Sequence, residues 1–541
     1  MSNKIDKLKL PFTFLAENRK EPFTDKMEKA AIYCFAELER MKGGGLILKK
    51  PEEKTVFLAE FHYPFWVAPW NGLNLVFDGL RQVSHTITYK NIPSAREFFE
   101  NASRSSKSME AYTAFLSDHV NFFQAPAEEK KLALDALAAD SAFLGEFAQY
   151  LAEAKPLETR EAQEAFLLPH LDELAVLSAV EELEKLKTDF ETEVATLNSC
   201  IRLLNKTTRI FVRDIRGKIK TVREEFDAEI RKQKEVVVQE ISRLNEDYEE
   251  QRVKLMKDFE KQLVPLQKEK LKLEKMRDQI ARKIEQYNLE AKSCAASGDS
   301  AGEKRWKEKA NEAKRELSEM ERKIEETEEH IKELEESREA ETFRLRSEWE
   351  NRIKEARKGV LELEASRDAK IQVYQDEMSR LENLTSNIIQ QINNVVKMRE
   401  ADLAEFNNLG APRKCKNLSL VYVPFYMACF EAELKKRYVV FPPSVANSIG
   451  FTTKLKGALG KAKVRQLLTP RFRALNSFME KLPILIDKDA AFAREVYEAG
   501  EKADILKSEA ARKAIGEGLK KLMDEGWLSD KEFEDLIQKL A

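Results

Sequence analysis

Apolar residues recur at alternating steps of three and four along the charged stretch from Asp172 to Asn408, as in Ile215, Ile219, Val222, Phe226 and Ile230. On an α-helix this spacing forms one narrow apolar stripe, the pattern of a coiled-coil seam. The stripe is interrupted near residues 294–302, where small turn-forming residues cluster. Because the two runs are of similar length, we predict an antiparallel hairpin of two long helices. The same seam also suits pairing with another copy of the chain, and the sequence leaves both arrangements open.

A hairpin of this kind brings the segments before and after it together at one end. We therefore predict a predominantly α fold with a long antiparallel coiled-coil hairpin and a small α/β head built from both flanks. The predicted regions are an N-terminal head module (1–125), a helical connector (126–171), the arm (172–408), a C-terminal β/basic module (409–470) and a helical tail (471–541). Within the arm, Pro265 predicts a kink or local break, since proline removes a helical hydrogen bond.

Turn residues and periodicity predict the elements of the flanks. Asp25 and Glu28 resemble a capping box that opens a helix at 25–41, and Asn71-Gly72 is typical of a hairpin turn. Predicted strands are 46–49, 55–70, 73–77, 84–89, 418–431 and 437–441. Predicted helices beyond Pro93 are 95–102, 108–123, 127–154, 454–468, 471–480, 489–499, 508–525 and 530–540.

The two flanks share a short motif. Pro64–Ala68 reads Pro-Phe-Trp-Val-Ala and Pro424–Ala428 reads Pro-Phe-Tyr-Met-Ala, and each leads into a turn and a further strand. We infer a duplicated module whose two copies pair about a pseudo-twofold axis; chance similarity of two proline-aromatic strands is the alternative. The predicted module contact comprises Phe65, Trp66, Trp70, Phe425, Tyr426 and Phe430, with ordinary core packing as the alternative.

Charge is balanced globally but not locally. The 92 basic and 95 acidic residues give a net charge of −3, so no global field attracts an anionic polymer. Between Ala411 and Met479, however, thirteen basic residues stand against two acidic ones. The predicted nucleic-acid-binding residues are Lys435, Lys436, Arg437, Lys454, Lys456, Lys461, Lys463, Arg465, Arg471 and Arg473. An acidic protein partner or a merely solvated surface remain the alternatives.

Recognisable catalytic and cofactor motifs are missing from the sequence. The Gly43–Gly45 triplet lacks the Gly-Lys-Ser/Thr of a phosphate loop, and no zinc-protease, Cys-x-x-Cys or nucleophile-elbow motif occurs. His62 and His85 could face each other across the first sheet, but without a third ligand they make a poor metal site. We therefore predict no enzymatic activity, no cofactor and no metal.

Cysteine usage and hydropathy bear on location. The five cysteines are scattered and odd in number, which favours a reducing compartment over a disulfide framework. We find neither a signal-peptide core nor a run of about 20 apolar residues that a membrane span needs. The prediction is a cytoplasmic protein without a membrane span.

Two resemblances add expectations. Residues 518–534, with Leu522, Gly526, Trp527, Ser529 and Phe533, resemble the short C-terminal SHOCT helical hairpin over about 25 residues. That resemblance implies an oligomerisation or tethering tail, with Leu522, Trp527 and Phe533 as contact residues. The arm-and-head plan also resembles the chromosome-maintenance (SMC-type) ATPases, although neither flank has their nucleotide-binding motifs.

These observations predict a non-enzymatic, elongated structural protein that forms a homo-oligomer. Its head would bind DNA or RNA through the basic region while the arm bridges or spaces. The alternative is a self-assembling scaffold or adaptor that docks a partner protein, such as an ATPase or a cytoskeletal element.

Overall fold

The computed structural model describes residues 5–16, 19–41, 51–126, 128–158, 164–433, 435–446 and 468–540. The chain forms two compact units: unit 1 comprises Met1–Lys206 with Leu384–Ala541, and unit 2 comprises Thr207–Asn383. The predicted strand at 46–49, the glycine triplet and most of the predicted helix at 454–468 lie outside the described residues.

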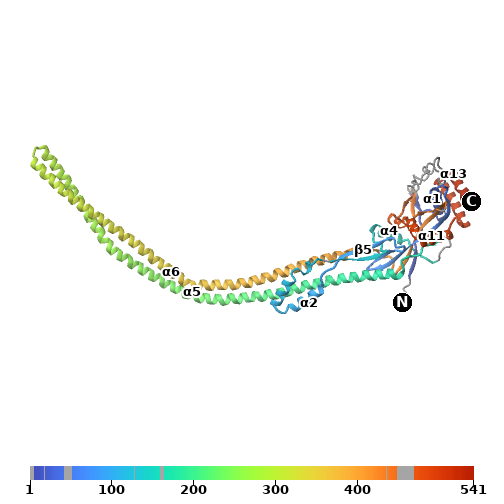
Figure 1. Cartoon of the computed structure of the whole chain (residues 1–541), viewed down its shortest axis with the longest axis horizontal. Helices are drawn as coiled ribbons and strands as arrows, with labels where there is room; N and C mark the ends of the chain where they lie inside the picture. Colours follow the sequence, from blue (N-terminus) through green and yellow to red (C-terminus); the bar gives the residue numbers. More distant parts are fainter. Residues whose placement is uncertain are drawn as a thin grey trace. The chain divides into compact units, whose positions relative to one another are not determined.

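Two very long helices, α5 (Glu173–Ala296) and α6 (Ser300–Glu405), occupy the stretch in which the seam was predicted (Figure 1). Gly298, at φ +78°, lies in the turn between them. The predominantly α character of the fold is thus confirmed. A local break at Pro265 is excluded, since α5 continues through that residue, and a kink there stays a prediction. Neither long helix, nor any other helix in the described ranges, is apolar enough over a sufficient length to cross a bilayer.

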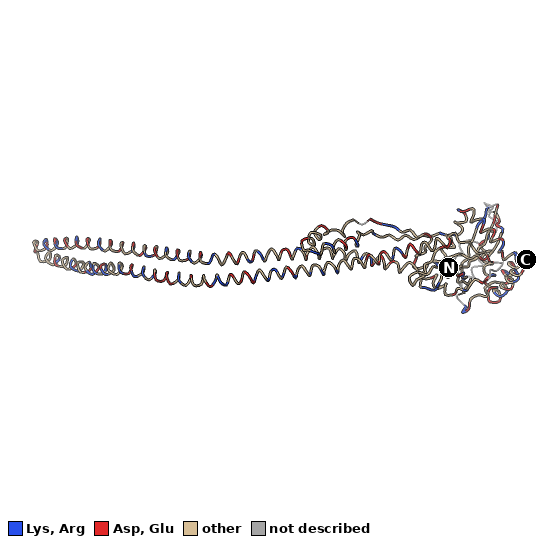
Figure 2. The backbone as a smooth tube through the Cα atoms, turned by 90° about the horizontal axis from the view of Figure 1, so that it is seen from below, with Lys and Arg blue, Asp and Glu red and all other residues tan. Residues whose placement is uncertain are grey.

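Within unit 2, early residues of α5 contact late residues of α6, so the helices run antiparallel. Arg367 pairs with Asp227 at 2.8 Å, and the rings of Tyr248 and Trp349 stack at 4.9 Å. Ile230, Val237 and Val360 share one small apolar cluster. Basic and acidic residues are interspersed along both helices (Figure 2), as expected when a narrow stripe is buried and the rest faces water.

Unit 1 is organised by β3 (Lys54–Trp70) and β10 (Ser419–Ala432), which come from opposite ends of the chain and pair antiparallel over most of their length. Among the described residues, eight strands form this sheet in the order β7-β1-β10-β3-β4-β9, with β11 also paired to β10 and β8 to β3. The additional strands are β1 (Asp6–Lys9), β4 (Leu73–Asp78), β7 (Lys155–Pro156), β8 (Glu164–Phe166), β9 (Ala411–Pro412) and β11 (Lys435–Phe441). The two flanks therefore build one sheet.

The strand register is nearly symmetric about the centre of the sheet. Tyr63 pairs with Val423, and these are the residues that precede Pro64 and Pro424 of the repeated motif. Each central strand turns back into a hairpin partner, β4 or β11, and each also has a short parallel neighbour, β8 or β1. Asn71 and Gly72, both at positive φ, make the first hairpin turn as predicted.

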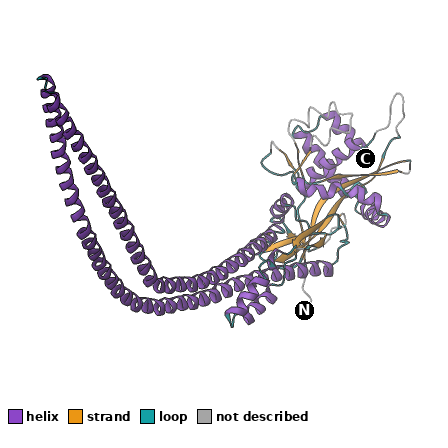
Figure 3. Cartoon of the chain, turned by 60° about the vertical axis from the view of Figure 1, so that its left-hand side comes forward, coloured by secondary structure: helices purple, strands orange, loops and turns teal. Residues whose placement is uncertain are grey.

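Side chains of the two central strands alternate between two buried faces. One face, including Phe65 and Phe425, packs on α4 (Ser141–Leu151), α9 (Arg473–Glu480), α10 (Leu482–Lys488) and α11 (Ala490–Lys502). On the other face, Leu58 and Phe430 pack on α1 (Asp25–Glu39), α12 (Glu509–Asp524) and α13 (Asp530–Leu540). Farther along that face, Trp66 and Tyr422 pack with the first turns of α5. Figure 3 shows the strands of unit 1 with these helices around them.

Smaller elements complete unit 1. A two-stranded sheet joins β5 (Ser84–Lys90) to β6 (Glu129–Asp135), and a three-stranded sheet joins β2 (Leu15–Ala16), β12 (Ser444–Ala446) and β13 (Leu468–Pro470). Between β5 and β6 lie α2 (Ala95–Ser105), α3 (Met109–Asp118) and a 3-10 turn (Phe122–Gln124); a second 3-10 turn (Phe406–Asn408) follows α6. The buried Arg399 of α6 pairs with Glu193 of α5 and donates to the Lys90 carbonyl at 2.7 Å.

Three local predictions are wrong. The predicted helix at 127–154 contains strand β6, and its helical part begins only at Ser141, because pairing with β5 overrides the local pattern. Thr24, not Asp25, is the N-cap residue of α1, and the Glu28 carboxylate accepts from the Phe14 N–H at 2.8 Å instead of capping its own helix. His85 lies on β5, in a different sheet from His62, so the two histidines do not face each other across one sheet.

Candidate functional site

The predicted basic surface is only partly described. Lys454, Lys456, Lys461, Lys463 and Arg465 lie outside the described residues. Lys435, Lys436 and Arg473 are exposed. Lys436 also sits above the Tyr497 ring, with its ammonium nitrogen 3.4 Å from the ring centroid.

Acidic side chains already pair with both remaining arginines. Arg437 donates to the Glu53 carboxylate at 2.6 Å and to the Glu39 carbonyl at 2.9 Å. Arg471 forms an ion pair with Glu153. A guanidinium that is paired within its own chain contributes less net positive potential to a phosphate than a free one does. The described part of this surface is therefore less basic than its composition suggests.

The predicted module-contact residues are divided among the packing clusters. Phe65 and Phe425 lie on one face of the sheet, whereas Tyr426 and Phe430 lie on the other with α1 and α12. Trp66 and Trp70 pack near the start of α5. Backbone pairing of β3 with β10 is what joins the two motifs, and these aromatics fill the cores on either side.

The predicted oligomerisation residues lie in the tail hairpin. Leu522 and Trp527 are buried in the core cluster that α1 and α12 share, and the Trp527 ring meets the Phe23 ring edge-on at 5.5 Å. Phe533 is partly buried against the same cluster. Gly526, at φ +80°, ends the α12 segment, and Ser529 and Glu532 cap α13 reciprocally. In this arrangement the tail contacts its own chain.

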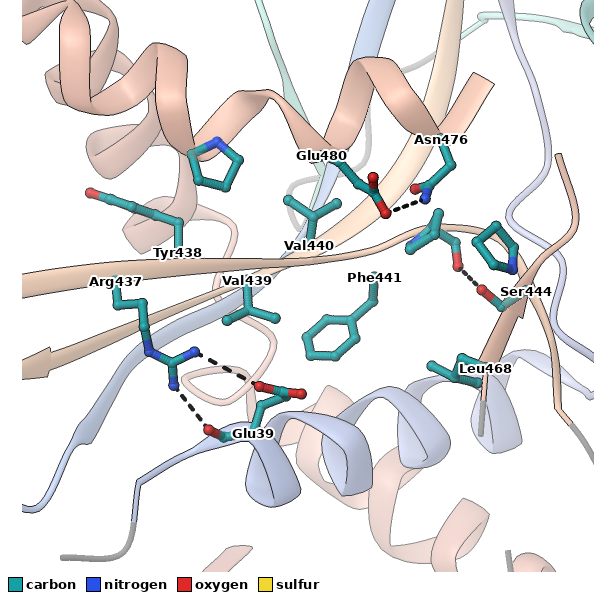
Figure 4. A pocket seen from close by; sticks show the side chains of 13 residues that line it. Glu39, Arg437, Tyr438, Val439, Val440, Phe441, Ser444, Leu468, Asn476 and Glu480 are labelled. Carbon is teal, nitrogen blue, oxygen red and sulfur yellow. Dashed lines mark hydrogen bonds and ion pairs between the residues drawn. The ribbon is translucent and has the colours of Figure 1, made fainter. Parts of the chain in front are cut away.

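A cavity of about 450 Å³ lies beside β11 (Figure 4). Its walls include Val439 and Phe441 of β11, the Arg437–Glu39 pair at one end, and Asn476, whose amide donates to Glu480 at 2.9 Å. Its rim also includes Ser444 and Leu468, which flank residues 447–467, outside the described chain. The cavity has no cluster of nucleophilic or metal-binding side chains among its lining residues.

A polar cluster at the centre of the sheet was not predicted. Glu60 and His62 are two residues apart on β3 and so point to the same face of the sheet. Strand β8 pairs in parallel with β3 and sets Glu164 opposite Glu60. One ligand atom from each of the three side chains lies within 4.8 Å of the other two. Phe166 of β8 stacks on the His62 ring, with 4.3 Å between ring centroids.

Burial controls the protonation of this cluster. Burial lowers the pKa of His62 well below its usual value, and the nearby Lys9 ammonium lowers it further. Burial also raises the pKa of Glu60 to about 7, against the opposing effect of Lys9. His62 is therefore a neutral imidazole at pH 7, with one ring nitrogen available as an acceptor or ligand.

The sequence carries part of this signal. The Glu-x-His spacing within a strand places Glu60 and His62 on one face, but Glu164 is joined to them only by the non-local pairing of β8 with β3. The side chains beside His62 are therefore two carboxylates, Glu60 and Glu164, and not the predicted second histidine, His85.

Comparisons with known proteins add little. No protein-family model matches the chain, and the search of curated proteins gave no match. Among solved structures, a computationally designed three-helix bundle is similar at 16% identity over 42% of this chain and 97% of its own, with a TM-score of 0.12. So low a score carries no argument. The SHOCT-like and SMC-like resemblances stay predictions.

Proposed function

We propose that this chain is a non-enzymatic cytoplasmic scaffold in which α5 and α6 form an antiparallel coiled-coil arm and the sheet of unit 1 forms a head that docks a partner. One observation carries the proposal: contacts between the two helices keep a constant antiparallel register through unit 2, from Asp227 with Arg367 to Tyr287 with Trp306. In such a register, the apolar stripe of each helix can face the other helix along its whole length.

The length of the helices supports a spacing role. At about 1.5 Å per residue, the 106 residues of α6 have a contour length of about 160 Å. Most side chains on both helices are polar or charged, and the buried stripe is narrow. Two long paired helices span a large distance and enclose little volume. This architecture suits a spacer better than a binding cavity.

Nucleic acid is the first partner we propose. The exposed cations Lys435, Lys436 and Arg473 belong to the same basic region as the five cations between Lys454 and Arg465. Each phosphate neutralised by such a cation releases counterions, so binding should weaken steeply with salt.

The test measures the affinity for labelled duplex DNA and RNA by fluorescence anisotropy, at salt concentrations from about 50 to about 200 mM, a range over which phosphate contacts weaken strongly. The head variant reverses three charges: Lys461→Glu, Lys463→Glu and Arg465→Glu. The matched control reverses three exposed lysines of α5: Lys232→Glu, Lys254→Glu and Lys257→Glu. We expect the head variant to bind more weakly and with a shallower dependence of affinity on salt. The control variant should keep the affinity and the salt dependence of the wild type. Equal binding by all three proteins would reject the basic region as the binding site, and absence of binding by the wild type would reject nucleic acid as the partner.

A protein partner, including a second copy, is the second candidate. The observation that favours it is a set of large apolar side chains that are exposed on unit 2, among them Val238, Phe343 and Leu361. Light scattering on the full chain at several concentrations tests self-assembly. Deleting the tail is a poor probe, because Gly518 of α12 packs directly on α1. The sharper variant is Val238→Glu with Phe343→Glu, which should reduce the oligomer mass if these side chains mediate assembly.

A further inference from the structure

The polar cluster on β3 and β8 has the composition and spacing of a metal site. We propose that Glu60, His62 and Glu164 bind one divalent transition-metal ion, with Zn²⁺ the best fit. One imidazole nitrogen and two carboxylates are a donor set that Zn²⁺ accepts, whereas Mg²⁺ and Ca²⁺ prefer oxygen ligands alone. Three protein ligands leave at least one coordination position for water.

The distances fit a single ion. His62 Nε2 lies 3.6 Å from Glu60 Oε1 and 3.8 Å from Glu164 Oε2. Ligand atoms that share one Zn²⁺ at about 2.0–2.2 Å lie about 3–4 Å apart, because tetrahedral and octahedral angles fix that separation. Small rotations of the two carboxylates would therefore complete the coordination without moving the strands.

The outer oxygens of the two carboxylates are already held. Tyr426 donates its hydroxyl hydrogen to Glu60 Oε2 at 3.1 Å, and Lys9 pairs with Glu164 Oε1. The oxygens that remain, Glu60 Oε1 and Glu164 Oε2, are those nearest His62 Nε2. Metal sites commonly orient their carboxylate ligands through partners of this kind in the outer shell. Tyr426 would be a positioning residue in this site, whereas the Lys9 ammonium would occupy the outer oxygen of Glu164 and oppose a nearby cation.

Unpartnered atoms point independently to a ligand. His62 is fully buried, and neither of its ring nitrogens has a hydrogen-bond partner among the described residues. Glu164 Oε2 is also buried without one. Buried polar atoms that lack partners are costly, and two of them, His62 Nε2 and Glu164 Oε2, lie 3.8 Å apart, which calls for an ion or a water molecule between them.

The site has an approach for a cation. Glu60 and Glu164 line a pocket of about 410 Å³ that also contains Lys9 and Tyr426. The other charged side chains lining it are Asp25, Glu28, Glu158, Lys29 and Lys155. Five carboxyl groups and three ammonium groups therefore line the pocket through which a cation would reach Glu60 and Glu164.

Metal binding can be measured on the full chain. Protein stripped with a chelator is titrated with Zn²⁺ in competition with a chromophoric chelator. We expect one Zn²⁺ per chain that is lost on the substitution His62→Gln and weakened by at least about 10–100-fold by Glu60→Gln or Glu164→Gln, since even outer-shell partners of a metal contribute that much. His85→Gln and Glu97→Gln are the matched controls, because both residues lie in described parts of unit 1 away from the cluster, and they should change nothing.

The substitution Lys9→Met distinguishes an effect on Zn²⁺ binding from a general loss of structure. Removing the ammonium removes a positive charge beside the ion, so this variant should bind Zn²⁺ more tightly, by about tenfold. Loss of packing alone would not tighten binding. Absence of stoichiometric Zn²⁺ binding, or equal losses in the controls and the cluster variants, would overturn the proposal in favour of an ordered water.

X-ray absorption of Zn²⁺-loaded wild-type protein gives a readout that requires no variant. The expected first shell contains only nitrogen and oxygen at about 2.0–2.2 Å, with the scattering of one imidazole. Sulfur in that shell, or two or more imidazoles, would place the ion elsewhere and contradict the assignment. This experiment is independent of nucleic-acid binding and of self-assembly.

Discussion

The sheet core of unit 1 and the helix seam of unit 2 bury apolar side chains in different ways. In unit 1, the fully buried Phe65 ring lies within 5.6 Å, between centroids, of rings from α4 and α9. In unit 2, Val237 is buried in a small cluster, while its neighbour Val238 is 65% exposed. A core closed in three dimensions couples distant segments, whereas a stripe couples only the turns that face each other. Damage should therefore spread in unit 1 and stay local in unit 2.

The largest expected effect is in the sheet core. Phe65→Ala should cost unit 1 about 3–5 kcal/mol, because it removes a buried ring and leaves a cavity. Phe343→Ala, at a side chain of unit 2 that is 75% exposed, is the control and should stay within about 0.5 kcal/mol. Hydrogen exchange measured on separate peptides gives the local stability of each unit by itself. Similar losses for the two variants would contradict the comparison.

The buried polar residue Glu28 gives unit 1 a pH dependence. Burial raises its pKa to about 8, with Asp25 and Glu60 acting in the same direction and Lys29 and the Phe14 N–H opposing them. Because the folded-state pKa lies above the ordinary value of 4.5, the folded chain binds this proton more tightly than the unfolded chain does. Its contribution to stability is present below pH 4.5 and is lost as the pH rises through about 8.

Glu28→Gln removes this titration and retains an acceptor for Phe14. Urea unfolding with a chelator present should show similar stabilities near pH 4.5 and a variant more stable than the wild type above pH 8, by about 1–3 kcal/mol. A difference of the opposite sign would show that the carboxyl group is ionised in the folded chain.

Two glycines of α12 test the closeness of its packing on α1. A Cβ at Gly518 would lie 2.0 Å from the Lys26 carbonyl oxygen, whereas a Cβ at Gly516 meets nothing closer than 3.8 Å. Gly518→Ala should therefore force the helices apart and cost about 1–3 kcal/mol. Gly516→Ala should stabilise α12 by up to about 1 kcal/mol, since alanine favours helix. Thermal unfolding distinguishes them, and shifts of the same sign would mean that the tail does not pack as described.

The smallest effect belongs to the seam. Val237→Ala should cost about 1 kcal/mol and speed hydrogen exchange only in the nearby turns of α5 and α6. Val238→Ala, one residue along, should change exchange little because its side chain already faces water. Loss of protection throughout unit 2 in the first variant would mean that the helix pair is one cooperative block.

The elements that the sequence predicts well are those whose signal is local. A stripe repeated over more than about 200 residues predicts the long helices α5 and α6. The Asn71-Gly72 pair predicts the turn of the β3–β4 hairpin. The helix predicted at residues 129–135 is strand β6, because Leu132 and Leu134 lie in an alanine- and leucine-rich run that suits a helix as well as a strand. Pairing with β5, about 45 residues earlier, decides the outcome.

The candidate sites also differ in whether their signal is local or depends on contacts between distant segments. The repeated Pro-aromatic motif was visible in the sequence, and it lies on the two strands that meet at Tyr63 and Val423. The Glu60–His62–Glu164 cluster was missed because its third member comes from a three-residue strand a hundred positions away. Local pattern cannot supply a contact of that kind.

The proposed coiled-coil arm depends on α5 and α6 of one chain pairing with each other. Spin labels at Glu250→Cys and Glu348→Cys, in a Cys294→Ser background, place one label on each helix at the same level of unit 2. Pulsed electron resonance on labelled chains diluted into excess unlabelled protein should give a label separation of about 10–25 Å, since packed helix axes lie about 10 Å apart. A short distance that disappears on dilution, or a separation beyond this range, would contradict the account.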